Sequence, residues 1–240
     1  MAATYSTLAG GVTALKALVR VDERLNSDVA AALTEPHWED ALTRAVQETY
    51  SDDRPRHLVL SITGDGSTRK HQLSAVSGSK WRDGWSSVRG PRVEYPAGST
   101  PPYWRADGWR VHRGTDGSDY LYTTGWIVAS SEEVEVPYNA PHEIGAAACS
   151  VQAGHHGAVL ALAAHLLILG IMSERMRITA EEVDAESVDL KTEAERWEKL
   201  GKAYLDEYRR RVPLVAPAAV VLFEPKTIGG TDYAFHGRRP

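Results

Sequence analysis

The sequence predicts an α+β protein, in which a helical adaptor-like core of about four helices carries an inserted antiparallel β module and an extended C-terminal arm. Apolar residues recur with a helical period near both ends of the chain, and short runs rich in valine, tyrosine and tryptophan lie between them. The last segment holds an apolar run between prolines. The predicted boundaries are 1–55 and 141–212 for the two parts of the helical core, 56–140 for the β module and 213–240 for the arm.

Composition limits the class of protein. The chain has 240 residues, of which 42% are hydrophobic and 25% charged, as in soluble globular proteins. Met1–Val12 has neither a basic start nor an apolar stretch, so no signal peptide is expected. Cys149 is the one cysteine, which excludes an intrachain disulfide framework. The formal net charge of −5 argues against a nucleic-acid binder that works through an extended basic face.

The first part of the chain reads as helical. Val12, Leu15 and Val19 recur at a period near 3.6 residues. A second helix is predicted in TEPHWEDALTRAVQETY, because Pro36 stands at the position that proline favours at a helix start. That helix should end near Arg54, since the residue before a proline is pushed out of the helical region.

Residues 56–140 carry the signals of short antiparallel strands. Asp65-Gly66 predicts a tight hairpin turn after the first strand. Val134 and Val136 alternate with glutamates, as on a half-buried strand. The further β-rich runs are RVEYP, GWRVHR, DYLYTTGWIVA and EEVEVPY.

The most apolar run is GHHGAVLALAAHLLILGIM, and it raises the question of a membrane span or a metal site. The uncharged stretch Ala158–Met172 is shorter than the roughly 20 residues that a span needs, so we expect a buried helix and no membrane. His155, His156 and His165 fall on different helical faces, at about 100° per residue. We therefore expect them to satisfy backbone groups near the helix start, and we expect no metal.

A second helix, 188–211, has the clearest amphipathic pattern and ends before Pro213. The acidic stretch 181–195 carries seven carboxylates against one lysine and is interpreted as a solvated face. An alternative is an acidic surface that repels DNA, as suits a conduit through which DNA slides. The candidates for that surface are Glu181, Glu182, Asp184 and Glu186.

No constellation of catalytic residues is found, so the chain is predicted not to be an enzyme and to need no cofactor. Gly64-Asp65-Gly66 lacks the further residues of a phosphate-binding loop. No serine lies in a GxSxG motif. Cys149 adjoins an apolar run, where a buried structural cysteine is the commoner case.

Several motifs occur in an order that resembles one known family. The segments are ALTRAVQETYSDDRPRHLVLSITGDG, KWRDGWSSVRGPRVEYPAGSTPP, VEVPYNAPHE, AVLALAAHLLILGI and VDAESVDLKTEAERWEKLGKAYLDEYRRRV. In this order they resemble the head–tail adaptor (head-completion or connector) proteins of long-tailed bacteriophages and gene transfer agents. The resemblance covers most of residues 38–211. Gly201 departs from it, because alanine is usual at that place in the last helix.

The resemblance implies a virion structural protein at the neck, which resides in the host cytoplasm before assembly. Such adaptors form a homo-oligomeric ring of about twelve copies (a dodecamer) under the portal protein. They extend the DNA channel without sequence-specific binding and offer a platform to stopper or tail-completion proteins. The resemblance also implies an arm that docks on the portal, with Val220, Val221, Leu222, Phe223, Tyr233 and Phe235 as candidates. Helix packing and subunit contacts are expected from Leu162, Leu166, Leu169, Trp197, Tyr204 and Tyr208.

Two other functions stay open at this stage. One is a metal-assisted hydrolase that uses His155 and His156 with part of the acidic stretch, against which the helical phase argues. The other is a glycan-binding or host-surface-binding β module, which needs exposed rings. The candidate rings are Trp81, Trp85, Trp104, Trp109 and Trp126.

Overall fold

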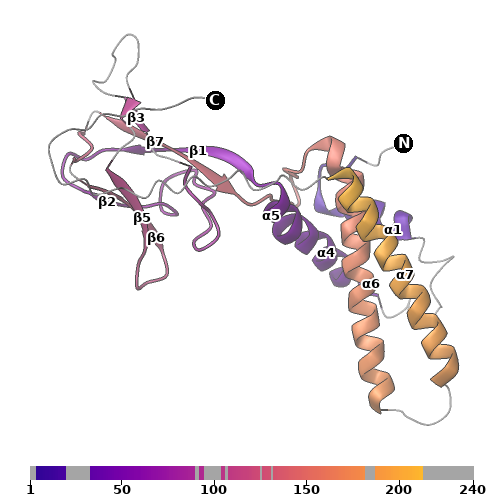
Figure 1. Ribbon diagram of the computed structural model, residues 1–240. Helices are drawn as coiled ribbons and strands as arrows, with labels where there is room; N and C mark the ends of the chain where they lie inside the picture. The colour runs from indigo at the N-terminus through magenta and orange to yellow at the C-terminus, as the bar shows by residue number, and fades with distance from the viewer. Residues whose placement is uncertain are drawn as a thin grey trace, which may run out of the picture.

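The computed structural model describes residues 4–19, 33–89, 92–94, 104–105, 108–124, 126–130, 132–181 and 187–212. Within them, helices gather at one end of an elongated molecule and strands at the other (Figure 1). This arrangement confirms the predicted α+β class. The helical segments are α1 (Leu8–Val19), α4 (Glu35–Arg44), the π-helical turn η1 (Ala45–Tyr50), α5 (Ser51–Asp53), the 3-10 turn η2 (Ala153–His155), α6 (His156–Glu181) and α7 (Ser187–Arg211).

One continuous run of helix, from α4 through η1 to α5, leads into the β module. At its start the Thr34 amide donates to Nδ1 of His37 at 3.1 Å, which satisfies a backbone group at the helix end. At its end Arg54 has φ −143° and ψ 70°, outside the helical region. The helix therefore stops before Pro55, as the sequence predicts, because the proline ring crowds the residue that precedes it.

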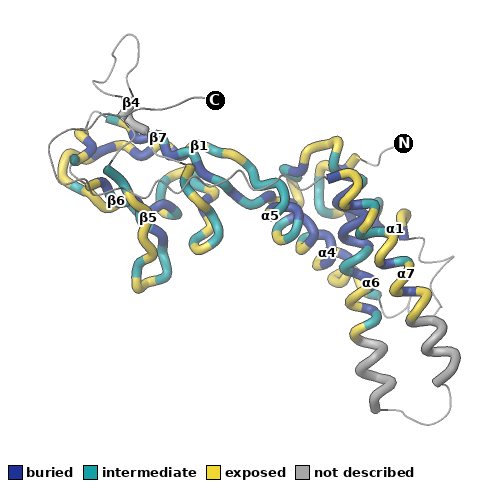
Figure 2. The backbone as a smooth tube through the Cα atoms, in the orientation of Figure 1, coloured by how far each residue is buried: buried dark blue, intermediate teal, exposed yellow. Residues whose placement is uncertain are grey.

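Four helices, α1, α4, α6 and α7, bury their apolar faces in one core, drawn as the dark blue stretches of Figure 2. Val12, Leu15 and Val19 of α1 are buried there. Gly11 permits a close approach of α1 to α4, because a Cβ at this position would lie 2.6 Å from Cδ2 of Leu42.

Two features of α6 and α7 bear on the sequence predictions. Ala153–Ser173, 21 residues, is long and apolar enough to cross a membrane by length and composition, so the expectation that this run is too short was wrong. Core helices of soluble proteins have the same property, and 61% of an 18-residue window of this stretch is buried inside the protein. On α7, a Cβ at Gly201 would lie 3.4 Å from Cγ2 of Ile168, an ordinary contact, so close packing does not require glycine there.

The β module contains two antiparallel sheets. The first has the strand order β1-β7-β3-β4, formed by β1 (Arg56–Thr63), β7 (Glu133–Ala140), β3 (Arg92–Glu94) and β4 (Trp104–Arg105). The second has the order β2-β6-β5, formed by β2 (Lys70–Gln72), β6 (Asp119–Thr123) and β5 (Trp109–Arg113). Both share a small core that includes Leu60, Leu73, Leu121, Val134, Val136 and Tyr138. As the sequence predicts, Val134 and Val136 alternate with less buried neighbours.

The predicted hairpin at Asp65-Gly66 is wrong. The strand before it, β1, pairs with β7, whereas the strand after it, β2, pairs with β6 in the other sheet. An Asp65 carboxylate oxygen accepts from the amides of Ser67 and Thr68 at 2.8 and 2.6 Å, so the segment is an aspartate-capped loop. A tight hairpin forms instead between β5 and β6, where Gly117 has φ +80°.

A buried aspartate ties the second sheet to the loop after β2. Oδ2 of Asp119 accepts from the Trp81 indole at 3.2 Å and from the Gly84 amide at 2.7 Å. The Asp119 amide in turn donates to Asp83 Oδ1 at 2.8 Å. Because Asp119 and Trp81 are both buried, these bonds fix the loop on the module.

Candidate functional site

The helical core and the β module meet at a polar junction, which we define as residues 50–54, His142 and residues 150–156. Ser51 is fully buried, and its hydroxyl donates to the Val46 carbonyl at 2.7 Å. The same hydroxyl accepts from the His142 amide at 2.7 Å. One serine on the α4–α5 helix therefore holds the chain as it returns from the last strand.

The His142 ring completes this link. Its Nε2 lies 2.8 Å from the Arg54 carbonyl, and its Nδ1 lies 3.0 Å from the Ser150 carbonyl and 3.1 Å from the Ser150 hydroxyl. Burial lowers the pKa of His142 below the ordinary value for histidine. A neutral imidazole has one N–H, so the ring donates to one of these two carbonyls and not to both. The imidazole thus links its own segment to the segments that contain Arg54 and Ser150.

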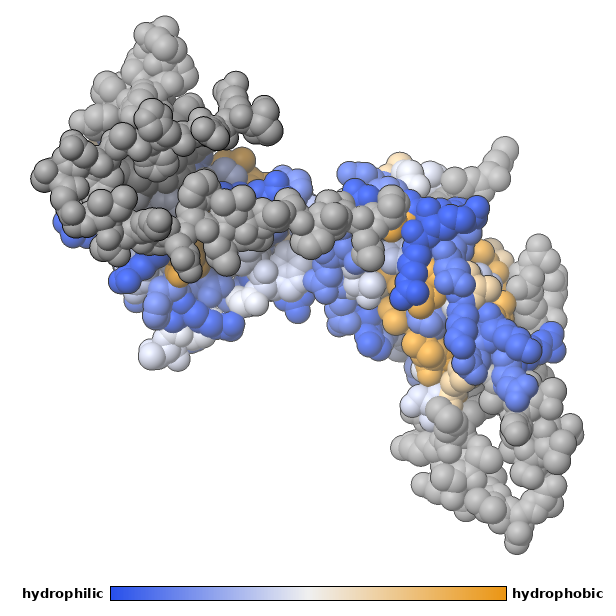
Figure 3. All heavy atoms as spheres, in the orientation of Figure 1, coloured by the Kyte–Doolittle hydropathy of each residue, from blue (hydrophilic) through white to orange (hydrophobic). Residues whose placement is uncertain are grey.

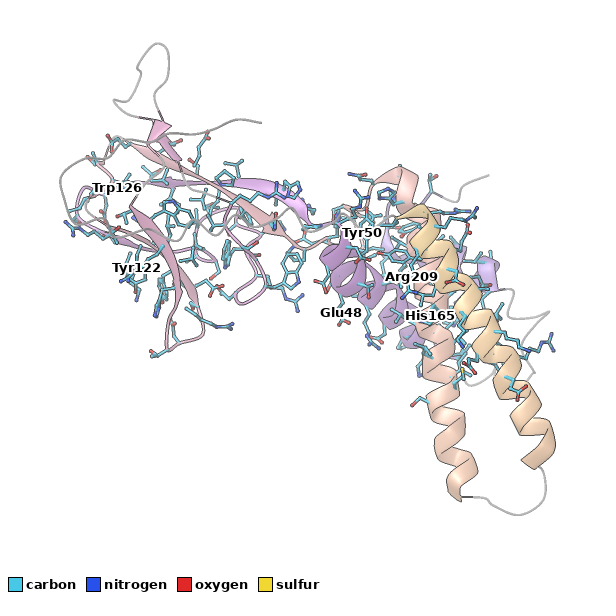
Figure 4. All side chains as sticks on the ribbon, in the orientation of Figure 1. Glu48, Tyr50, Tyr122, Trp126, His165 and Arg209 are labelled. Atoms are coloured by element: carbon cyan, nitrogen blue, oxygen red, sulfur yellow. The ribbon has the colours of Figure 1, made fainter. Side chains whose placement is uncertain are left out.

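Tyr50, labelled in Figure 4, lies between two histidines of the junction. Its hydroxyl is 2.7 Å from Nδ1 of His155, and its ring centroid is 4.7 Å from that of His142. Burial raises the pKa of Tyr50 and lowers the pKa of His155, where nearby Arg54 adds to the effect. Both side chains are therefore neutral near pH 7, and a phenol with a raised pKa is a poor nucleophile.

The N-terminal segment is held against the junction by a second ring pair. Tyr5 and His156 stack with ring centroids 4.3 Å apart, and the Tyr5 amide donates to His156 Nδ1 at 3.0 Å. The other ring nitrogen of His156 donates to the Val151 carbonyl at 3.1 Å. The prediction that this histidine satisfies backbone groups near the helix start is confirmed. Burial raises the pKa of the Tyr5 hydroxyl far above its usual range.

The C-terminal end of α7 also contacts the junction. The Tyr208 hydroxyl donates to Asp53 Oδ2 at 2.5 Å, which joins α7 to the turn before the β module. Burial and this carboxylate raise the pKa of Tyr208. Ion pairs of Glu143 with Lys80 at 3.3 Å and Arg56 at 3.7 Å lie on the β side of the junction. The junction therefore holds both ends of the helical core together with the first and last strands of the module.

The alternative of a metal-assisted hydrolase, and that of a cysteine nucleophile, gain no support from the described residues. No group of three or more histidine, cysteine or acidic residues there could hold a metal ion. His165 lies on α6 and bonds the Gly201 carbonyl of α7 at 3.0 Å, away from His155 and His156. Burial raises the pKa of the half-buried Cys149, which disfavours its thiolate.

The expected helix-packing residues divide into three groups by their burial. Leu162, Trp197 and Tyr208 are buried inside the core of their own chain. Leu166 and Tyr204 are half-buried at its edge. Leu169 is 47% exposed on α6. Hydrophobic residues gather over the helical end in Figure 3, while the described part of the β module is mainly hydrophilic there. Leu169 is thus the candidate in this set that a neighbour could cover.

The other candidate residues mostly lie outside the described residues. This holds for the whole arm, with Val220, Val221, Leu222, Phe223, Tyr233 and Phe235, and for Glu182, Asp184 and Glu186. Glu181 is the last residue of α6, and its side chain also lies outside the described part.

The described tryptophans of the β module pack against its core or donate hydrogen bonds. Trp81 is buried, and Trp109 and Trp126 pack against the small core. The Trp85 indole donates to Asp52 Oδ1 at 2.8 Å, which adds a contact across the junction. The side chain of Trp104 lies outside the described part. None of the four described rings is among the exposed large hydrophobic residues of the described chain.

The sequence analysis assigned no role to the junction residues Tyr5, Ser51, His142 and Ser150. A usable signal was present, because Tyr50-Ser51 and Pro141-His142 both fall inside segments quoted for the family resemblance. Nothing in either segment shows that the two meet, since their pairing depends on the path of the strands between them.

Comparison with known proteins finds one kind of assembly. No protein-family model and no curated protein matches the chain. Among solved structures, the chain is similar to a chain described as "Neck of empty GTA particle computed with C6 symmetry", where GTA denotes a gene transfer agent. The sequence identity is 17%, the match covers 78% of this chain and 87% of that chain, and the TM-score is 0.29. A TM-score this low does not establish a shared fold. The function is therefore inferred from the residues of this chain.

Proposed function

We propose that this chain is a structural head–tail adaptor of a tailed phage or gene transfer agent. In this role it forms a ring under the portal, extends the DNA channel and offers a platform to stopper or tail proteins. It is not an enzyme and works at the neck of the particle after assembly from the host cytoplasm. The ordered motifs over residues 38–211 are the starting point for this proposal.

The contact between Ser51 and His142 carries the proposal. These residues belong to two of the segments quoted for the resemblance, they are 91 positions apart, and a buried hydrogen bond of 2.7 Å joins them. Motifs that are separated by a whole β module therefore form one structural unit. The two segments meet because β1 and β7 are paired, with Arg56 opposite Ala140.

The architecture suits a connector. The helical core and the β module each have a hydrophobic core of their own, and they lie at opposite ends of the molecule (Figure 1). Each end can then contact a different neighbour, as a protein between a portal and a tail must. The domain boundaries 1–55, 56–140, 141–212 and 213–240 belong to this proposal.

We assign the neighbouring-subunit contact to Leu169 and the half-buried residues beside it. Because Leu169 is 47% exposed, covering its remaining surface should contribute about half of the roughly 1.5–3 kcal/mol that full burial of a leucine gives. Replacement of Leu169 by aspartate should prevent ring formation on the portal. Val59→Asp is the matched control, because Val59 is 57% exposed on β1 at the other end of the molecule. Rings formed equally by both variants would contradict this interface.

The portal contact is assigned to the arm, residues 213–240. Val212 must stay with the core, because it is 1% exposed and its amide donates to the Tyr208 carbonyl at 2.8 Å. A chain that ends at Val212 should therefore fold, with an unchanged helix signal in circular dichroism, and fail to bind the portal. Portal binding by this shortened chain would remove the arm from the proposal and leave the ring.

A further inference from the structure

The second sheet of the β module carries two parallel rows of polar side chains on its outer face. The strand register places Lys70, Tyr122 and Arg110 side by side in the first row. Gln72, Tyr120 and His112 form the second row in the same way. Directly opposite residues in an antiparallel sheet point to the same face. We call these six residues the cationic–aromatic face.

The tyrosines hold the cations of this face in place. Lys70 Nζ lies 3.8 Å from the ring centroid of Tyr120 and 5.9 Å from that of Tyr122, the residue labelled in Figure 4. The Arg110 guanidinium carbon lies 5.7 Å from the Tyr122 ring centroid. The two tyrosine ring centroids are 6.4 Å apart. Because cation–π contacts restrict these long side chains, less conformational entropy is lost when they bind an anion.

The face has the polarity of an anion-binding surface. Lys70, Arg110 and His112 are exposed, while both tyrosines are half-buried. Neither row contains an acidic residue. The nearest hairpin carboxylate, Asp116, accepts from the Tyr120 hydroxyl at 2.5 Å and from the Ser118 amide at 3.1 Å. These neutral donors fix the Asp116 carboxylate at the hairpin turn, beyond the second row, and lower its pKa, so it stays charged there.

We propose that the cationic–aromatic face binds the phosphate backbone of double-stranded DNA without reading its sequence. Lys70 and Arg110 would each neutralise a phosphate, and the exposed His112 ring adds a hydrogen-bond donor. Two cations per chain give weak binding, which repetition in an assembly strengthens. The inference does not rest on the adaptor assignment, because a single chain carries the whole face.

A polyanion with phosphates suits this face better than a protein surface does. Neither row contains an aliphatic side chain, whereas protein–protein interfaces have an apolar centre. Protein–DNA interfaces are more polar and more positively charged. The total charge of −5 does not oppose this, because the charge that a ligand meets is that of the local face.

The test measures binding of the full-length protein to a fluorescent DNA duplex by anisotropy between about 50 and 200 mM salt. The double variant Lys70→Gln, Arg110→Gln should bind about tenfold more weakly at the lowest salt. The negative slope of log K against log salt should become shallower by about 2. The matched control is Lys199→Gln with Arg209→Gln, two exposed cations of α7. It removes the same charge and should leave the slope nearly unchanged.

Three results would overturn the proposal. The first is equal weakening in both double variants, which would mean that DNA responds only to net charge. The second is full binding by the Lys70/Arg110 variant. The third is competition by polyglutamate as strong as that by unlabelled DNA at equal charge, which would assign the face to an acidic polypeptide.

Discussion

The helical core and the β module are stabilised in different ways. The helical core buries long apolar faces of four helices that come from both ends of the chain. The β module has a smaller core, shared by two sheets, and depends on polar anchors such as the buried Asp119. The difference suggests that the helical part is the rigid body of the protein and that the β module is a separately folded attachment. The junction at Ser51 and His142 determines how far the two are coupled.

The largest expected effect is the loss of stability when one hydrophobic core, helical or β, is disrupted without the other. Leu162 and Leu121 are both essentially inaccessible, one in each core. Replacement of either by alanine should cost about 2–5 kcal/mol of unfolding free energy. Amide hydrogen exchange, measured on proteolytic peptides, should be faster in the helices of the Leu162→Ala variant. In the Leu121→Ala variant it should be faster only in the sheets. Faster exchange throughout the molecule in both variants would mean that it unfolds as one unit.

The next effect tests the junction. Ser51→Ala removes the acceptor for the buried His142 amide and should cost about 1–3 kcal/mol, the penalty for an unsatisfied buried group. Ser61→Ala is the control, because Ser61 is exposed and bonds Glu133 at 2.9 Å on the surface. Chemical denaturation should also show the helix and sheet transitions moving apart in the Ser51 variant. Equal midpoints for both serine variants would argue that the junction does not couple the two regions.

A smaller effect tests how tightly the helical core is packed. Gly11→Ala should destabilise the protein by about 1–2 kcal/mol, because overpacking outweighs the better helix propensity of alanine. The neighbouring Gly10 is exposed, so Gly10→Ala should be neutral or slightly stabilising. Thermal melting of the pair measures the difference. A stabilised Gly11 variant would show that α1 and α4 can separate at little cost.

The smallest effect is a pH dependence at the junction. Burial lowers the pKa of His142, so below the unfolded value of 6.5 the unfolded chain binds more protons than the folded one. The stability from the neutral ring is full above pH 6.5 and declines as the pH falls. His155, with a pKa lowered in the same direction, adds to this decline. His142→Gln should reduce the slope between pH 6.5 and 5 by less than about 1.4 kcal/mol per unit, the limit for one proton. Identical slopes would contradict the neutral-ring assignment.

The same contrast explains what the sequence could predict. Helices follow from local periodicity, and the stop at Arg54 follows from the next residue. Strand partners are not local. Four Asp-Gly pairs occur in the β module, and the glycine has a positive φ in each, namely Gly66, Gly84, Gly108 and Gly117. Of these, Gly117 lies in the hairpin between two paired strands, β5 and β6. An Asp-Gly pair therefore indicates a change of chain direction but not which strands lie on either side of it.

In the candidate site, too, the sequence predicts local features but not contacts between distant segments. Burial of Trp197 and Tyr208 could be predicted from helical spacing. The contact of Ser51 with His142 could not, because it spans the whole β module. The net charge is likewise a sum over the whole chain, so it does not reveal that Lys70 and Arg110 flank Tyr122 of β6.

Electron microscopy of portal rings mixed with the full chain tests the adaptor proposal most directly, with the chain ending at Val212 as a parallel sample. We predict a closed ring of this protein seated on the portal with the full chain only, in which the helical core contacts its neighbours near Leu169. Absence of any ring with either chain would contradict the proposal.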